Sequence, residues 1–592
     1  VTGCPFPAGI GLSEGVTVRY ERGGGSDGQA VPLTNPTPGG VRWWELSFVG
    51  TATGEATVEP KDGSIPGGEP MVDRDDEEVD IDNGLVRVVI PLLTGSAPLR
   101  IKWKDGAGEF VPEVLTDELG RCHEAVGRER QVRTLRNGPI RSQTEIKGIL
   151  SGDDGEVDYR ITLEIWRELS ALRLDWMITN RVPGKRDLTV KKASLRGTWQ
   201  VGGEPRRVFR QPNHGANFRP LDVVNPDPVT LVADETCACT HVSDPEMLRD
   251  DAEYPFYCAP PQIGTGRWLE LRGGKGRVSA QVVDFTDTRP NALVSGENYL
   301  SYQMVPEGKA LTWPQGRRKE QHLLLAFGGS ESDLEPEALA ARAGKVFALG
   351  RAQPAPSTLR EFGCFDLDRI FNYEPARHYR LNTLLEQLCD LESRGTKWDL
   401  GDTPDWHYTR GTGGAPNRYH PLPGAGDLPR HYRAGGGRVF PDVFKYFLEP
   451  VWINNEYDMI HALATQVLRT GSNDHFRMLR WAARHNVEVD FVSYSDDPWH
   501  HRASPFHSHF HNRKGAITSH MWTQGLLQYY CLTGDRDARE VALALGDKII
   551  EFDSDEEVRE WKFDREIGWG LLALCCLAEA GYGQYLTEAG KI

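Results

Sequence analysis

The hydrophobic pattern of the chain changes its period close to residue 350. Before this point, short runs such as 161–166 and 172–178 alternate apolar and polar residues. Period-two runs separated by Gly, Asp and Pro clusters are typical of antiparallel strands. After it, segments such as 384–391 and 460–468 carry apolar residues at helical spacing. The sequence therefore predicts a β front part followed by a helical back part.

A polar, glycine-rich stretch at 61–78 divides the β part again. Such composition between patterned segments is typical of a linker. We therefore expect a multidomain β + α protein with three domains. These are a small N-terminal β domain (1–72), a large antiparallel β-sandwich (73–350) and a helical domain (351–592) that carries the chemistry.

The helical part contains a repeated helix ending. Gly471 and Gly534 each follow an apolar helical stripe and precede a short polar turn. Glycine adopts the left-handed conformation that commonly ends a helix, so each position predicts a helix end and the start of the next helix. A repeated helix–turn–helix pattern indicates an α/α toroid or solenoid. Because 351–592 is short for a complete toroid, we expect a partial one.

The net charge of the chain limits the kinds of partner that it can bind. The 592 residues include 85 acidic and 68 basic side chains, giving a formal net charge of −17. This balance argues against nucleic acid or a membrane surface as partner, although a local basic pocket could still bind an anionic substrate. We find no phosphate-binding loop, dinucleotide fingerprint or nucleophile elbow. Cys237, Cys239 and His241 lack the second half of a zinc site.

The first polar cluster of the helical part lies at 452–461. If this segment is helical, Asn454, Tyr457, Asp458 and His461 share one face. Amide, phenol, carboxylate and imidazole groups on one face suit a substrate cleft. The alternative is a polar network at the start of a helix, with Asn454 or Asn455 as its cap.

A second cluster is rich in histidine. His507, His509 and His511 alternate with other residues, so an extended loop would direct all three to one side, and His520 and Trp522 follow. Convergent imidazoles suit a transition metal, or a base with substrate-binding companions. The alternative is an exposed loop with no function.

Two further segments supply candidate binding residues. Asp402 and Trp406 lie in a Gly- and Pro-containing loop whose Trp and Asp residues suit sugar stacking and hydroxyl binding, unless the Trp side chains simply pack inward. His214 lies on a predicted loop of the sandwich that could reach a domain interface.

Three blocks of the chain carry a family resemblance: the opening 3–9 with 40–44, the central 401–403 with 452–463, and His509 and His511 with 519–527 and 532–535. Together they resemble the exo-rhamnogalacturonan lyase family, polysaccharide lyase family 26. The resemblance covers essentially the whole chain. It implies β-elimination at a uronic acid, where the carboxylate is neutralised, a base takes the C5 proton and an acid protonates the departing C4 oxygen.

The resemblance implies a His of the loop as base, Tyr457 as acid or second base, and Arg502 with Asn455 neutralising the carboxylate. The complete expected site has catalytic Tyr457, Arg502, His507, His509 and His511, and substrate-binding His214, Asp402, Trp406, Asn454, Asn455, Glu456, Asp458, His461, His520 and Trp522.

Two other functions stay open. A glycoside hydrolase acting on an acidic polysaccharide would need two carboxylates, which Glu456, Asp458, Asp402 and Asp405 could supply. A non-catalytic carbohydrate-binding protein would use the tryptophan residues alone.

The expected partner is an acidic polysaccharide or oligosaccharide. We expect no metal site and no required cofactor, and leave open whether calcium assists. Such a substrate favours a secreted or periplasmic protein, with the cytoplasm as alternative, although this chain begins at Val1 with no signal peptide.

Overall fold

A computed structural model of the chain describes two compact units. The first consists of Val1–Pro66 with Arg351–Ile592, and the second is Gly67–Gly350. The described residues are 2–7, 12, 15–21, 23–35, 40–48, 56–61, 69–94, 98–185, 187–203, 206–210, 220–223, 229–233, 238–242, 268–283, 291–308, 310–329, 354–355, 358–359, 458–504, 516–555 and 564–592.

The first unit begins with a five-stranded antiparallel sheet, in the order β1-β4-β3-β2-β5. Trp43 and Trp44 are adjacent on its strand β4, so they point to opposite faces. Trp44 packs into a small core formed by the sheet, whereas Trp43 packs into the core of the C-terminal helices. The strands are β1 (Thr2–Pro7), β2 (Val16–Tyr20), β3 (Gly25–Pro32), β4 (Val41–Phe48) and β5 (Ala56–Pro60).

This sheet therefore belongs to the same compact unit as the helices, although the sequence analysis treats 1–72 as a separate domain. Leu33 and Val41 are buried in the helical core. The hydroxyl of Tyr530 donates a hydrogen bond to the carbonyl of Leu33 at 2.6 Å. Gly3 lies so close to helix α6 (Gln524–Thr533) that an added Cβ would overlap the carbonyl oxygen of Cys531.

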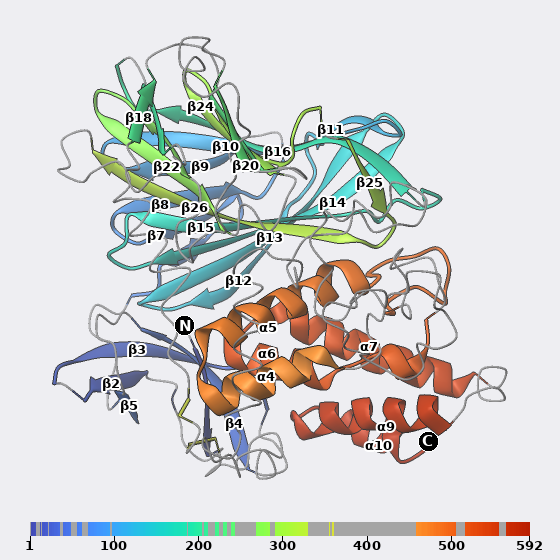
Figure 1. The fold of residues 1–592 in the computed structure, drawn as a ribbon. Coiled ribbons are helices and arrows are strands. Elements are labelled where there is room, and N and C mark those ends of the chain that lie inside the picture. The colour runs from blue at the N-terminus through green and yellow to red at the C-terminus, as the bar shows by residue number, and fades with distance from the viewer. Residues whose placement is uncertain are drawn as a thin grey trace, which may run out of the picture. The chain divides into compact units, whose positions relative to one another are not determined.

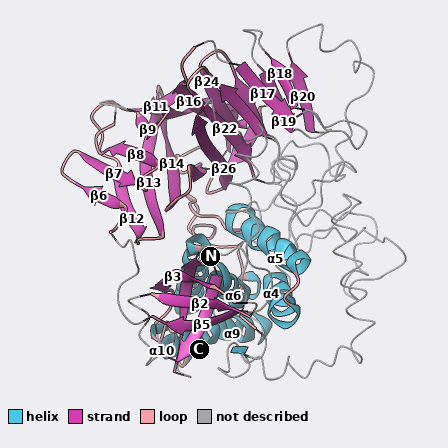
Figure 2. Cartoon of the chain, turned by 90° about the vertical axis from the view of Figure 1, so that its left-hand side faces the viewer, coloured by secondary structure: helices cyan, strands magenta, loops and turns pink. Residues whose placement is uncertain are grey.

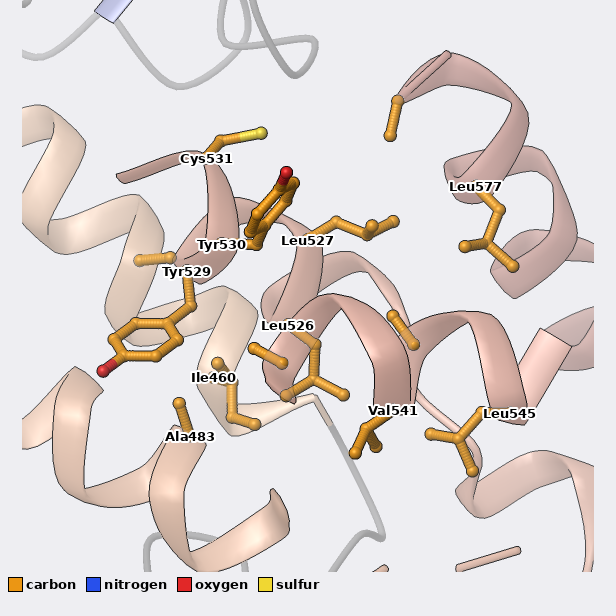
Figure 3. Close-up of a cluster of buried hydrophobic side chains, with 14 of the residues drawn as sticks. Ile460, Ala483, Leu526, Leu527, Tyr529, Tyr530, Cys531, Val541, Leu545 and Leu577 are labelled. Atoms are coloured by element: carbon orange, nitrogen blue, oxygen red, sulfur yellow. The ribbon is translucent and has the colours of Figure 1, made fainter. Parts of the chain in front are cut away.

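The helices of the first unit surround one apolar core (Figures 1 and 3). They are α4 (Met459–Thr470), α5 (Asn473–His485), the π-helical turn η6 (Asn486–Asp490), the 3₁₀ helix η7 (Thr518–His520), α6 (Gln524–Thr533), α7 (Arg536–Ser554), α9 (Asp564–Glu579) and α10 (Gln584–Ala589). Within the described residues, none of these helices is long and apolar enough to cross a bilayer.

The predicted helix endings are confirmed. Gly471 ends α4 at φ 67° and Gly534 ends α6 at φ 73°, both left-handed. Ser472 and Asp535 then cap the next helices through their side chains. Two successive helical hairpins, α4–α5 and α6–α7, follow from this repeat. The segment 360–457 lies outside the described residues, so the toroid itself stays a prediction.

The second unit is β structure, as predicted (Figures 1 and 2). Its strands form one system that closes on itself, and the described pairings are antiparallel. The strands are β6 (Val72–Arg74), β7 (Glu78–Asp82), β8 (Val86–Pro91), β9 (Leu99–Trp103), β10 (Gly106–Thr116), β11 (Gly120–Glu124), β12 (Gln131–Asn137), β13 (Arg141–Gly152), β14 (Gly155–Trp166), β15 (Ala171–Thr179), β16 (Asp187–Gln200), β17 (Arg206–Arg210), β18 (Pro220–Val223), β19 (Val229–Ala233), β20 (Ala238–Val242), β21 (Trp268–Arg272), β22 (Gly276–Val282), β23 (Asn291–Ser295), β24 (Tyr299–Val305), β25 (Leu311–Pro314) and β26 (Arg318–Gly329).

The polar face of strands β13, β14, β15 and β26 carries buried ion pairs. Arg141 Nη2 lies 2.6 Å from Glu164 Oε2, and Trp166 Nε1 donates to Glu164 Oε1 at 2.9 Å. On the same face Arg160 Nη2 lies 2.9 Å from Glu320 Oε1. Burial by itself raises the pKa of Glu164, but the charges of Arg141 and Arg173 and its hydrogen bonds hold that pKa below its usual value.

We predict that Gly3→Ala destabilises the first unit by about 1–3 kcal/mol, because the new methyl group would overlap the backbone of α6. Gly568→Ala in α9 is the control, since nothing lies within 4 Å of an added Cβ there. Urea unfolding measures both variants. Equal stability of Gly3→Ala and the unchanged protein would contradict the close approach.

We predict that Glu164→Gln lowers the free energy of unfolding at pH 7 by about 3 kcal/mol, because the buried Arg141 loses its opposite charge. The folded pKa of Glu164 lies below the unfolded value. The contribution of Glu164 to the free energy of unfolding is therefore complete above the unfolded pKa, about 4.3. It is lost as the pH falls through the folded pKa.

The difference between Glu164→Gln and the unchanged protein should accordingly shrink below about pH 4 in unfolding curves measured at several pH values. Glu59→Gln is the control, because Glu59 and Arg19 form an exposed pair that contributes little. A difference that stays constant through the acid range would show that the charge of Glu164 is not responsible.

Candidate functional site

Asp458 joins the N-termini of two helices. It is the N-cap of α4, and its Oδ1 accepts a hydrogen bond from the backbone N–H of His461 at 2.8 Å. Its Oδ2 accepts from the N–H of Gly525, in the first turn of α6, at 2.9 Å. Burial raises the pKa of Asp458 above its usual value, and the charge of His461 and these N–H groups oppose the rise.

This arrangement corrects the prediction for 452–461. Helix α4 begins at Met459, so Asp458 is its cap, not a member of a shared helical face, and the cap of α4 is neither Asn454 nor Asn455. The contact also requires Gly525. A Cβ there would overlap the backbone nitrogen of His461 and the carboxylate of Asp458.

His461 connects the same two helices through its side chain. Its Nδ1 lies 2.9 Å from Oε1 of Gln528, which is fully buried on α6. Within the described residues, the amide nitrogen of Gln528 has no hydrogen-bond partner. The structure thus brings two predicted binding residues, Asp458 and His461, into one cluster.

Cys576 on α9 is a buried thiol whose pKa is influenced by this cluster. Burial raises the pKa of Cys576 to about 12, with smaller contributions from the charges of Glu579 and Asp458.

A hydrogen-bonded chain links η7 to the start of α9. The hydroxyl of Ser519 lies 3.1 Å from Nδ1 of His520 and 3.2 Å from Oε1 of Glu566. Thr518 Oγ1 also donates to the backbone carbonyl of Glu566, at 2.9 Å, which fixes η7 against α9. Ser519, His520 and Glu566 are all buried. Within the described residues, Oε2 of Glu566 has no hydrogen-bond partner.

Two tryptophans lie close in sequence to the hydrogen-bonded residues Ser519, His520 and Glu566. Trp522 and Trp569 are half-buried, with ring centroids 4.8 Å apart and planes inclined by 48°. The guanidinium of Arg565 lies 5.3 Å from the ring centroid of Trp569. Such aromatic faces offer large, rigid apolar surfaces on which a flat or ring-shaped ligand can pack.

Arg502 is held on a loop that packs on α7. It adopts φ 57°, a conformation uncommon for residues other than glycine. Its backbone N–H donates to Val492, and an antiparallel bridge between Val492 and Ala503 closes the loop. Its exposed guanidinium lies 3.2 Å from Oδ2 of Asp547, whose Oδ1 accepts from the hydroxyl of Tyr585 at 2.8 Å. The predicted carboxylate-binding arginine is therefore ion-paired here.

The remaining predicted site residues lie outside the described residues. They are His214, Asp402, Trp406, Asn454, Asn455, Glu456, Tyr457, His507, His509 and His511. Within the described part of the chain, no group of three or more His, Cys, Asp or Glu side chains is arranged to hold a metal ion.

Four residues of these clusters were not predicted from the sequence: Ser519, Gln528, Glu566 and Trp569. Ser519 lies directly before His520, within the block 519–527 that resembles the lyase family. Glu566 has no comparable local sign, because it lies 47 residues from Ser519 and meets it only through packing of α9 against η7.

Comparisons with known proteins add little to this geometry. No protein-family model matches the chain. No curated protein matches it either. A glycosyl hydrolase family 38 protein from Enterococcus faecalis is a similar solved structure, with 7% identity, 56% of this chain and 41% of that chain covered, and a TM-score of 0.33. This chain thus spans about two-fifths of that protein.

Two further solved structures are similar to parts of the chain. A galactose mutarotase-like protein from Lactobacillus casei has 8% identity, with 42% of this chain and all of that chain covered and a TM-score of 0.26. The galactosidase domain of an alpha-galactosidase–sucrose kinase has 8% identity, with 43% and 41% covered and a TM-score of 0.29. At these values the similarities assign neither a family nor an activity.

We predict that Asp458→Ala lowers the free energy of unfolding by about 2–3 kcal/mol, because two N–H groups at the starts of α4 and α6 lose their acceptor. Ser472→Ala is the matched control. Ser472 caps α5 through a single hydrogen bond from the N–H of His475, so Ser472→Ala should lower the free energy of unfolding by only about 1 kcal/mol. Denaturant unfolding compares them, and an equal or larger loss for Ser472→Ala would refute the double role of Asp458.

Proposed function

We propose that the chain cleaves a uronic-acid-containing polysaccharide by β-elimination, with His520 as the base that removes the C5 proton. The observation that carries this proposal is the buried chain from His520 through Ser519 to Glu566. Rhamnogalacturonan is the first substrate to test, because the sequence resembles the exo-rhamnogalacturonan lyase family. Exo action rests on that resemblance alone.

The hydrogen bonds determine which nitrogen of His520 carries the proton. An ionised carboxylate only accepts hydrogen bonds, so the hydroxyl of Ser519 donates its proton to Glu566. The same hydroxyl then accepts from Nδ1–H of His520. In the neutral imidazole this tautomer carries its proton on Nδ1, and Nε2 is then the nitrogen that can accept a proton as a general base.

The elimination step balances without another reactant. The C5 proton passes to Nε2 of His520, the C5–H electron pair forms the C4–C5 double bond, and the C4–O bond breaks. An acid then protonates the departing oxygen. Tyr457 is proposed for this role, and Arg502 and Asn455 for neutralising the uronate carboxylate. Trp522 and Trp569 would stack on a sugar ring.

A glycoside hydrolase is the second candidate function. It is favoured by Glu566, a buried carboxyl in the same cluster whose Oε2 has no partner among the described residues. Asp458, one of the carboxylates considered from the sequence, fits this reaction poorly, because both of its oxygens already accept backbone N–H groups. A hydrolase would need its second carboxylate elsewhere.

Incubation with rhamnogalacturonan and other uronate polymers distinguishes the two reactions. Elimination produces an unsaturated uronate with characteristic ultraviolet absorbance, and its product mass lacks the water that hydrolysis adds. Products that carry this added water and no such absorbance would overturn the lyase proposal and support the hydrolase.

We predict that His520→Ala lowers kcat by about 100-fold or more, because the proton acceptor is removed. Ser519→Ala and Glu566→Gln should lower kcat by a smaller factor and change its pH profile, with KM nearly unchanged, since they only orient the imidazole. The control is His500→Ala, whose imidazole pairs with Asp497 on the loop near Arg502. Full activity of a folded His520→Ala protein would eliminate His520 as the base.

A further inference from the structure

A second polar cluster lies in the second unit, on strands β15 and β26. Asp175 and His322 are directly opposite in the antiparallel register of these strands. Arg173 lies two residues before Asp175 on β15, so its side chain emerges on the same face. Three side chains of different chemistry therefore converge on one face of the sheet.

Close contacts connect the three side chains. Nδ1 of His322 lies 2.7 Å from Oδ1 of Asp175, and Nε of Arg173 donates to the same oxygen at 2.7 Å. Nη2 of Arg173 lies 3.2 Å from Nδ1 of His322. Burial by itself raises the pKa of Asp175, but the charges of Arg173 and His322 and their hydrogen bonds hold that pKa far below its usual range.

Asp175 is therefore an ionised carboxylate that only accepts hydrogen bonds, so Nδ1 of His322 donates to it, and the longer approach of Nη2 of Arg173 to Nδ1 is a contact between two donors and not a hydrogen bond. The neutral imidazole then presents an acceptor at Nε2. Within the described residues, three polar atoms of the cluster take no part in these contacts: Nε2 of His322, Oδ2 of Asp175 and Nη1 of Arg173. Together they offer two acceptors and one donor.

Solvent reaches this cluster more than the neighbouring ion pairs. The side-chain exposures are 27% for Arg173, 13% for Asp175 and 16% for His322. In the adjacent pairs the corresponding values are 6% and 8% for Arg141 and Glu164, and 10% and 5% for Arg160 and Glu320. The cluster is thus more open to solvent than the two ion pairs beside it, and a small ligand could reach it.

The charge of the cluster indicates the kind of ligand. The charges of Arg173 and Asp175 cancel, and the flanking Arg141–Glu164 and Arg160–Glu320 pairs are each balanced. No excess charge is left to attract an ion. Two acceptors beside one donor match the hydroxyl groups of a sugar, which both donate and accept hydrogen bonds.

We propose that Arg173, Asp175 and His322 form a binding site for a neutral saccharide on the second unit. The site lies on different strands and a different unit from the His520 cluster, so it does not depend on the proposed elimination reaction. Hydroxyl groups would donate to Asp175 and His322 and accept from Arg173.

Saturation-transfer NMR and calorimetry with D-galactose, D-glucose and L-rhamnose test this site, with D-galacturonate and D-glucosamine as charged probes. At least one neutral sugar should bind with millimolar affinity, and more tightly than either charged probe. His322→Ala and His322→Gln should each weaken binding by about tenfold, because the acceptor at Nε2 is lost or displaced. Asp175→Asn should also weaken it.

His123→Ala is the matched control, since His123 is an exposed histidine on β11 of the same unit. Thermal unfolding of each variant checks that the unit still folds, and the two His322 variants keep the test valid if Asp175→Asn does not fold. Absence of neutral-sugar binding in the unchanged protein would overturn the site, as would unchanged binding by folded His322→Ala or preferential binding of a charged probe.

Discussion

The packing of the C-terminal helices depends on one carboxylate placed where two helices begin. Asp458 accepts backbone N–H groups from the first turns of both α4 and α6, so the positive ends of the two helix dipoles meet at this residue. Two such ends repel each other unless a negative charge lies between them. The carboxyl group of Asp458 lies between them and accepts a hydrogen bond from each, and Gly525 leaves the space that it needs. The turn that carries His520 and Trp522 leads directly into this junction.

The two polar clusters use ionisable groups in different ways. In the first unit, Ser519 separates His520 from Glu566, so the carboxylate fixes the imidazole without touching it. In the second unit, Asp175 contacts His322 directly and Arg173 shares the same oxygen. Both arrangements set the tautomer of a histidine by supplying an acceptor for Nδ1–H. The surrounding charges differ, and this difference separates a candidate base from a candidate sugar-binding imidazole.

Local sequence patterns predicted the local structure well. The glycines at 471 and 534 ended helices because few other residues adopt the required conformation. Alternation along 161–166 predicted a strand, because side chains in a strand change face at every residue. Contacts between residues far apart in the sequence could not be predicted. Nothing near Glu566 indicates Ser519, and nothing near Leu33 indicates Tyr530. The cap of α4 could not be predicted from the sequence either, because several residues at 454–458 could serve equally well. In the structure the cap is Asp458.

The first unit is built from the two ends of the sequence, and this has a consequence for its synthesis on the ribosome. The contact between Leu33 and Tyr530 spans 497 residues, with the whole second unit between them. Gly67–Gly350 can fold as soon as it has emerged, because it forms a compact unit from its own residues alone. The N-terminal strands emerge first, yet Trp43 must stay exposed until the last helices are made. We therefore expect the nascent chain to expose an apolar, unpaired sheet face for most of translation, the condition under which chaperones are needed.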